Sequence, residues 1–226
     1  VYVSGSIAYV ADGRDGLEVI DISDPSRPVE IGRFDPGGDV CAVYVSGSIA
    51  CVIGSVMGLG LIDVSDPSNP SYIERYDVDY GVGVYVSGSI AYVAAEDWWY
   101  DLRVIDISNP SSPKEIGCFG DGAGAHGVYV SGSIVYIADG QDGLEIIDVS
   151  DPSKPVELGQ FDDGGEAYAV CVSGNIAYVA DGSDGLEIID VSNSSNPVEL
   201  GQFHDGGEAH GVYVSGNIAY VADGSD

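Results

Sequence analysis

Hydrophobic and polar residues alternate in short runs along the whole chain. In one representative stretch, two alternating runs, residues 128–130 and 134–138, flank Gly132. Alternation with a period of two residues predicts half-buried β-strands. Glycine provides the positive φ that a two-residue hairpin loop requires, so the pattern predicts that Tyr129 pairs with Tyr136 across this hairpin.

Two more runs complete the unit. Residues 144–149 and 156–161 are again rich in apolar side chains. The connection 139–143 is an Asp-Gly turn by composition, and the connection 150–155 contains two prolines, which end strand pairing. The unit is therefore predicted to be four antiparallel strands, and helical periodicity is not found along the chain.

The unit recurs at a nearly fixed interval. Its copies begin at Val1, Val43, Val84, Val128, Val170 and Val212, at steps of 42, 41, 44, 42 and 42 residues. A period near that length with four strands per copy is typical of a propeller blade. The predicted fold class is all-β, a β-propeller of four-stranded antiparallel blades. The predicted organisation is a single domain, 1–226, with repeats at 1–42, 43–83, 84–127, 128–169, 170–211 and a partial repeat at 212–226.

The partial repeat leaves three arrangements open, because both ends of the chain are the same half of a blade. The first is a longer chain with six or more blades. The second is an assembly in which another copy supplies the missing strands. The third is a five-bladed propeller with a redundant hairpin.

The third strand carries a recurring five-residue signature. It reads Leu17-Glu18-Val19-Ile20-Asp21, Leu59-Gly60-Leu61-Ile62-Asp63, Leu102-Arg103-Val104-Ile105-Asp106, Leu144 to Asp148 and Leu186 to Asp190. This signature resembles that of the LVIVD-repeat family of bacterial and archaeal surface-associated propellers. The resemblance covers essentially the whole chain and implies the scaffold. It implies no catalytic residues, since the family has no catalytic motif to carry over.

Charge changes the picture most. The chain has 37 acidic and 7 basic residues, a formal net charge of −30. Phosphate binding needs Lys and Arg, so nucleic acid is excluded as a partner. No stretch approaches the ~20 apolar residues of a membrane-spanning helix, so this segment is not expected to insert into a membrane. Two interpretations remain: solvated acids of a salt-adapted or cell-surface protein, or acids that bind Ca²⁺.

The acidic loops between second and third strands give the candidate metal ligands. Asp139 with Asp142, and Asp181 with Asp184, stand in Asp-Gly-x-Asp-Gly turns. Ca²⁺ takes oxygen ligands, and each turn offers two carboxylates, so Ca²⁺ is the one cofactor that the sequence suggests. The alternative is that Asp and Gly are there for turn geometry. The Asp that ends each third strand is interpreted as structural, because it recurs in all five full repeats.

Candidate ligand-binding residues come from two places. His126, Tyr168 and His210 stand two residues before a first strand, where we expect them to ring the mouth of the propeller channel on the acidic face. Trp98, Trp99 and Tyr100 lie in the longest of the second-to-third loops. Exposed aromatic rings beside acids are typical of sugar- and protein-binding surfaces.

These features favour a non-enzymatic binding or adhesion module at the cell surface or outside the cell, recognising a protein or glycan or other copies of itself. Asn193-Ser194-Ser195 fits an N-glycosylation acceptor and points to the same location. One alternative is a self-assembling structural subunit, a fibre or surface layer completed by strands from a neighbouring copy. The other is a metal-dependent enzyme with its site at the channel mouth.

Overall fold

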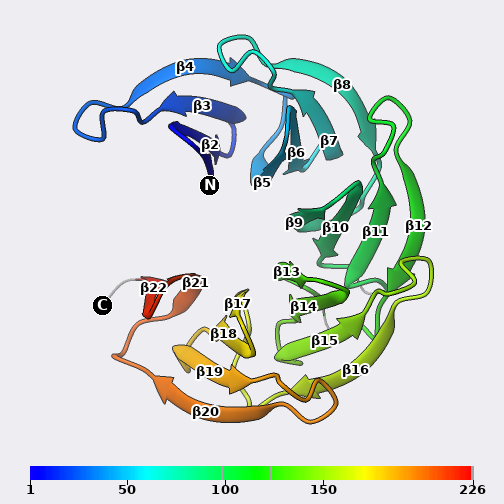
Figure 1. The fold of residues 1–226 in the computed structure, drawn as a ribbon, viewed down its shortest axis with the longest axis vertical. Coiled ribbons are helices and arrows are strands. Elements are labelled where there is room, and N and C mark those ends of the chain that lie inside the picture. Colours follow the sequence, from blue (N-terminus) through cyan, green and yellow to red (C-terminus); the bar gives the residue numbers. More distant parts are fainter. Residues whose placement is uncertain (98, 123, 225–226) are drawn as a thin grey trace. The chain divides into compact units, whose positions relative to one another are not determined.

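A computed structural model describes residues 1–97, 99–122 and 124–224. Every regular element in these residues is a β-strand. They form five four-stranded antiparallel sheets, here called blades 1 to 5, and one two-stranded sheet (Figure 1). Among the described residues there is no helix of the length and hydropathy that crossing a membrane requires.

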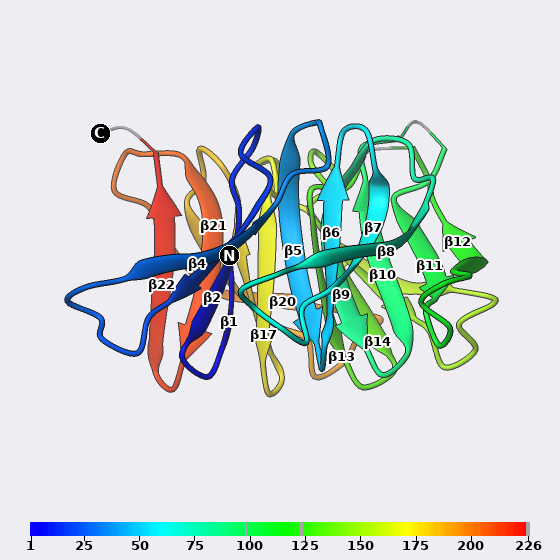
Figure 2. The same cartoon turned by 90° about the horizontal axis from the view of Figure 1, so that it is seen from above.

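Within each blade the strands pair in chain order. Blade 1 contains β1 (Tyr2–Ser4), β2 (Ile7–Ala11), β3 (Leu17–Asp21) and β4 (Val29–Phe34). Blade 2 contains β5 (Val40–Ser46), β6 (Ile49–Gly54), β7 (Gly58–Asp63) and β8 (Ser71–Tyr76), and Figure 2 shows its first three strands side by side. Blade 3 contains β9 (Gly81–Ser87), β10 (Ile90–Ala95), β11 (Leu102–Asp106) and β12 (Lys114–Phe119).

The remaining strands follow the same plan. Blade 4 contains β13 (Gly127–Ser131), β14 (Ile134–Ala138), β15 (Leu144–Asp148) and β16 (Val156–Phe161). Blade 5 contains β17 (Ala169–Ser173), β18 (Ile176–Ala180), β19 (Leu186–Asp190) and β20 (Val198–Phe203). The two-stranded sheet pairs β21 (Ala209–Ser215) with β22 (Ile218–Asp223).

The predicted hairpin pairing is confirmed. Ser131 pairs with Ile134 and Tyr129 with Tyr136, which leaves a two-residue loop whose first residue is Gly132. Gly132 has φ 63°, a conformation that costs other residues about 1–2 kcal/mol. Glycine therefore fixes the register that puts Tyr136 into the core.

The aspartate that ends each third strand shapes the turn after it, as predicted. In blade 4, the amide of Ser150 donates to Oδ1 of Asp148 at 2.8 Å. Equivalent bonds join Ser23 to Asp21, Ser65 to Asp63, Ser108 to Asp106 and Ser192 to Asp190. Donation from the following serine lowers the pKa of Asp21 and of its counterparts Asp63, Asp106 and Asp190. The recurring aspartate is thus a turn residue.

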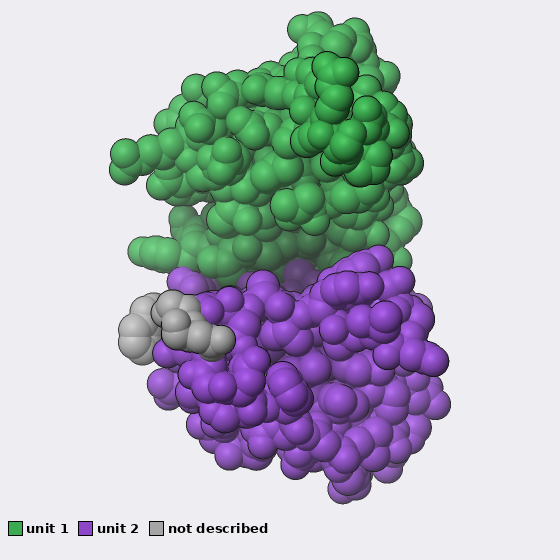
Figure 3. All heavy atoms as spheres, turned by 90° about the vertical axis from the view of Figure 1, so that its left-hand side faces the viewer, with its two compact units in different colours: residues 1–95, 104–116 green, residues 96–103, 117–226 purple. Residues whose placement is uncertain are grey.

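The described residues group into two compact units, coloured separately in Figure 3. Unit 1 comprises residues 1–95 and 104–116, and unit 2 comprises residues 96–103 and 117–226, of which 98, 123 and 225–226 are not described. In unit 1, Val19 of blade 1 packs in one cluster with Val52 and Ile62 of blade 2.

Unit 2 has its own core between neighbouring blades. Tyr136 and Ile146 of blade 4 are buried in one cluster with Val170 and Ile189 of blade 5. The first strands of this unit are also neighbours, since β17 contacts both β13 and β21 (Figure 1). Residues at equivalent places near these three strands are therefore brought close together.

Candidate functional site

Three rings from successive repeats form one row in unit 2, here called the aromatic row. His126 precedes β13, Tyr168 precedes β17, and His210 lies in β21. The amides of His126 and Tyr168 donate at 2.8 Å to the carbonyls of the residues that end β14 and β18, which sets both side chains at the same height on their blades. The ring centroid of Tyr168 lies 5.1 Å from that of His126 and 4.9 Å from that of His210. Tyr168 thus contacts both of the other sequence-predicted residues of this group.

Glutamates flank the row. His126 Nδ1 lies 2.8 Å from Oε1 of Glu96, and its Nε2 lies 4.0 Å from Oε1 of Glu166. Partial burial, together with the neighbouring carboxylate of Glu166, raises the pKa of Tyr168. Apolar ring faces therefore alternate with carboxylate acceptors, an arrangement suited to a ligand that offers both a flat apolar face and hydrogen-bond donors.

The aromatic loop 96–101 begins at the glutamate that holds His126. Trp99 is 76% exposed and Tyr100 is 38% exposed, so the expectation of a solvent-accessible indole is met by Trp99. The guanidinium of Arg103 lies 4.9 Å from the centroid of the Tyr100 ring. Trp98 lies outside the described residues.

Three of the four predicted metal ligands, Asp139, Asp181 and Asp184, belong to two acidic clusters of unit 2. Asp139 lies with Asp101 and Asp121 in the first cluster, and Asp181 and Asp184 lie with Asp163 in the second. In each cluster, one carboxylate oxygen per residue lies within 4.8 Å of the others. Each turn is therefore joined by an acid from the preceding blade. Asp142 stands beside the first cluster, and its pKa is raised by partial burial and by Asp121.

Buried glutamates accompany both clusters and were not among the sequence-predicted ligands. Glu145 is the second residue of β15 and is 0% exposed, and Glu187 is the second residue of β19 and is 3% exposed. Burial, with Asp139 and Asp121 nearby, raises the pKa of Glu145 to about 10. Burial, with Asp101 and Asp121 nearby, raises the pKa of Asp139 to about 8. The sequence signal that could have identified these glutamates is the presence of an acid inside an otherwise apolar strand.

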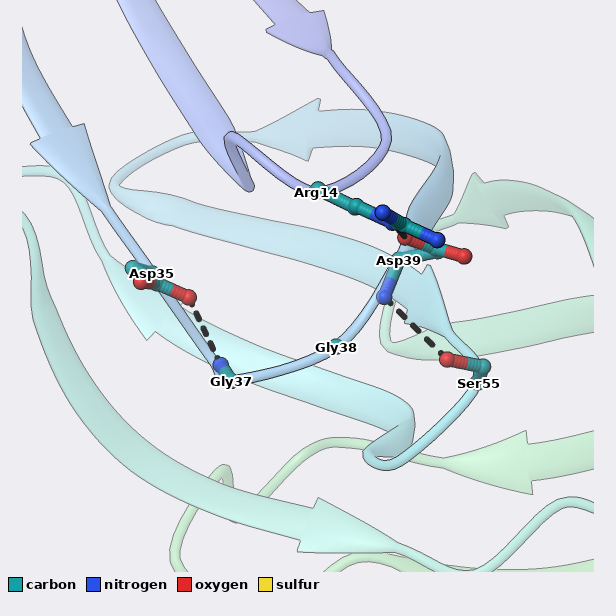
Figure 4. A pocket seen from close by; sticks show the side chains of 6 residues that line it. All are labelled: Arg14, Asp35, Gly37, Gly38, Asp39 and Ser55. Atoms are coloured by element: carbon teal, nitrogen blue, oxygen red, sulfur yellow. Dashed lines mark hydrogen bonds and ion pairs between the residues drawn. The ribbon is translucent and has the colours of Figure 1, made fainter.

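Unit 1 also contains a carboxylate group, Asp12, Asp15 and Glu18, but two of these acids lie beside an arginine. Glu18 and Asp15 of blade 1 lie 3.1 Å and 3.5 Å from Nη2 of Arg33. Figure 4 shows a surface pocket of about 400 Å³ in the same unit, lined by Arg14, Asp35, Gly37, Gly38, Asp39 and Ser55. There Asp35 accepts the Gly37 amide at 2.7 Å, and Arg14 pairs with Asp39 at 3.6 Å. Neither group leaves a buried carboxylate without a partner.

Comparisons with known proteins identify the repeat and the fold. The LVIVD repeat matches residues 1–36, 37–78, 81–121, 122–163, 164–205 and 206–226. The computationally designed Ika8 protein is similar in structure, with a TM-score of 0.75 and 14% identity over 98% of this chain and 66% of that one. A functionally unknown protein from Desulfotomaculum acetoxidans DSM 771 has a TM-score of 0.74 and 16% identity over 89% of this chain and 67% of that one.

A second designed protein, Ika4, has a TM-score of 0.54 and 17% identity over 68% of this chain and 91% of its own. The chain spans about two thirds of the length of the first two structures. No curated protein matches it significantly. At these identities the likeness concerns the fold alone, and the predicted fold class, an all-β propeller of four-stranded antiparallel blades, is confirmed.

Proposed function

The chain belongs to the LVIVD repeat family, and from that premise we propose that it is a non-enzymatic binding or adhesion module, displayed at the cell surface or outside the cell. Its ligand is a protein segment or a glycan. The observation that carries this proposal is the aromatic row of His126, Tyr168 and His210 with its flanking glutamates.

The chemistry of the row supports binding over catalysis. Nitrogen atoms of both histidines lie within 4.0 Å of glutamate oxygens. Activation of a nucleophile would need a hydroxyl or thiol within hydrogen-bonding reach of the base. Stacked ring faces instead pack on the apolar faces of sugars or on side chains, while carboxylates accept hydrogen bonds from hydroxyl or ammonium groups.

The aromatic loop extends the proposed surface. Its first residue, Glu96, is the partner of His126, so loop and row are connected by a direct contact. Trp99 exposes most of its side chain, and exposed aromatic residues are frequent anchors of protein and glycan contacts.

The test is binding of the purified chain to immobilised glycans and to cell-surface protein fractions, before and after Tyr168→Ala. Removal of a central anchor typically costs about 2 kcal/mol, so we expect binding to weaken about 30-fold. Tyr72→Ala is the matched control, because Tyr72 is a 48% exposed tyrosine of blade 2 and is not part of the aromatic row. Equal binding by wild type and Tyr168→Ala, or binding to no member of either panel, would overturn the proposal.

A further inference from the structure

Three positions of the repeat are acidic together or not at all. The first position lies two residues after the aromatic residue that ends a fourth strand. The second directly follows or ends the next second strand. The third directly follows the leucine that opens the five-residue signature of the next third strand. Leading into blades 4 and 5, the three positions read Asp121, Asp139, Glu145 and Asp163, Asp181, Glu187. Leading into blades 2 and 3, they read Pro36, Gly54, Gly60 and Val78, Ala95, Arg103. Each acidic set is here called an acidic triad.

The first triad contains buried carboxylates without partners. Asp139 and Glu145 are both 0% exposed, and none of their four carboxylate oxygens has a hydrogen-bond partner. Burial raises the pKa of each, and the nearby carboxylate of Asp121 adds to both shifts. Burial of an unpaired carboxylate costs several kcal/mol, and either a proton on each acid or a bound cation removes that cost.

The second triad repeats the arrangement one blade later. Asp181 and Glu187 are each 3% exposed, and Oδ1 of Asp181 and Oε1 of Glu187 have no hydrogen-bond partner. Burial raises both pKa values, and the nearby Asp163 adds to both shifts. Because buried carboxylate oxygens without partners occur at the same positions in two successive blades, we infer that both blades need the same compensating group.

The other blades meet this requirement with their own side chains. In blade 2, the absence of acids is matched by the buried side chain of Met57, which fills the space beside Gly60. In blade 1, Glu18 at the equivalent place is paired with the guanidinium of Arg33. In blade 3, the equivalent residue is Arg103, which pairs with Asp97 at 3.8 Å. At the positions where blades 4 and 5 have the acidic triads, blades 1 to 3 therefore have an apolar side chain or a guanidinium group.

We propose that each acidic triad of unit 2 binds one Ca²⁺ ion, at Asp121, Asp139 and Glu145 and at Asp163, Asp181 and Glu187. Ca²⁺ takes six to eight oxygen ligands at about 2.4 Å, so two oxygens on the same ion are up to about 4.8 Å apart. The aspartate oxygens of both clusters lie within that separation. Asp101 and Asp184 contribute a fourth carboxylate oxygen at the first and second sites.

The protein prepares the first site from one side. Asp101 accepts the amides of Asp121 at 2.8 Å and of Gly124 at 3.0 Å, which holds the loop carrying Asp121 against the cluster. Each oxygen of Asp101 accepts one of these bonds and keeps a second lone pair for the ion, whereas the oxygens of Asp139 and Glu145 accept no hydrogen bond. The division of roles leaves the buried pair as the principal ligands.

Calorimetric titration of the whole chain with CaCl₂, after removal of metal with EDTA, tests the proposal. We expect two ions per chain and a higher Tm than NaCl of equal ionic strength produces, because only folded chain holds the ligands together. A Tm increase that matched NaCl, with no heat of binding, would mean generic screening of the net charge and would overturn the proposal.

Variants assign the sites. Glu145→Gln should reduce the stoichiometry from two ions to one, whereas Glu157→Gln, the same charge change at an exposed position of β16, should leave it at two. If Glu145→Gln fails to fold, Asp121→Asn gives the same readout at an exposed ligand. Two ions bound by a folded Glu145→Gln or Asp121→Asn variant would refute the assignment of the first site.

Discussion

Gly165 lies against the carboxylate of Asp181, so closely that a Cβ at position 165 would overlap Cγ and both carboxylate oxygens. Gly207 stands in the same relation to Asp223 one repeat later. The loop of one blade thus approaches the acid of the next through a residue without a side chain. Gly165 does not have a positive φ, so the requirement for glycine is one of space.

Gly165→Ala should therefore destabilise the protein and weaken the second Ca²⁺ site. Overpacking of this kind typically costs about 1–3 kcal/mol, because backbone and neighbouring side chains must shift. Urea unfolding measures the loss. Gly201→Ala is the control, since no atom lies within 4 Å of its added methyl group, and its free energy of unfolding should change by less than about 1 kcal/mol. Equal stability of the two variants would show that Asp181 moves away at no cost.

Without divalent cations, the free energy of unfolding should fall as the pH rises from about 4 to 10. Burial raises the pKa of Asp181 to about 6, of Asp139 to about 8 and of Glu145 to about 10. A carboxyl that keeps its proton in the folded state stabilises below its unfolded pKa, near 4, and that contribution is lost as the pH passes through the folded value.

Denaturant titrations in EDTA at several pH values measure this slope. Glu145→Gln should flatten it at the alkaline end, while the exposed Glu157→Gln should leave it nearly unchanged. A free energy of unfolding that rose between pH 5 and pH 8 in EDTA would contradict the burial of these acids.

Met57→Ala should cost about 2–5 kcal/mol of stability, the usual range for truncation of a buried Met. Met57 is 5% exposed and packs beside Gly60 in the core of unit 1. Met57→Leu, which conserves volume, should cost less than about 1.5 kcal/mol. Thermal unfolding of both variants tests whether Met57 is a core residue. If it were a surface residue, both substitutions would lower the stability equally and only slightly.

Trp99→Ala should change the free energy of unfolding by less than about 0.5 kcal/mol, because the side chain is 76% exposed. Acrylamide, a neutral quencher insensitive to the net charge, should quench the emission of Trp99 efficiently. The emission lost in Trp99→Phe isolates this signal. Weak quenching, or a loss of several kcal/mol, would identify Trp99 as a packing residue and remove it from the binding surface.

Local features of this fold follow from the sequence because they depend on neighbouring residues. The strand Ile134–Ala138 and the pairing of Tyr129 with Tyr136 both agree with the alternation and with the glycine at 132. The turn bond of Asp148 spans two residues and is equally local. The repeat then copies each feature from blade to blade.

The acidic triads did not follow from local pattern, since their members come from different repeats. The Asp-Gly turns suggested that Asp139 acts with Asp142, whereas the cluster around Asp139 includes Asp101 and Asp121 of the preceding repeat. Glu145 sits in a strand whose neighbours are apolar, and its burial depends on how the blades pack. Two sequence signals could have indicated the site: an acid inside an otherwise apolar strand, and the joint presence or absence of acids at three repeat positions.

Because the acidic triads are confined to unit 2, the stability of unit 2 would depend on the calcium concentration and that of unit 1 would not. In unit 1 the equivalent places are filled by side chains of the protein itself, Met57 and Arg33. In unit 2 the equivalent places would be filled by Ca²⁺ ions bound from solution. Binding of Ca²⁺ would then be a final folding step for unit 2, and calcium depletion would destabilise unit 2 before unit 1.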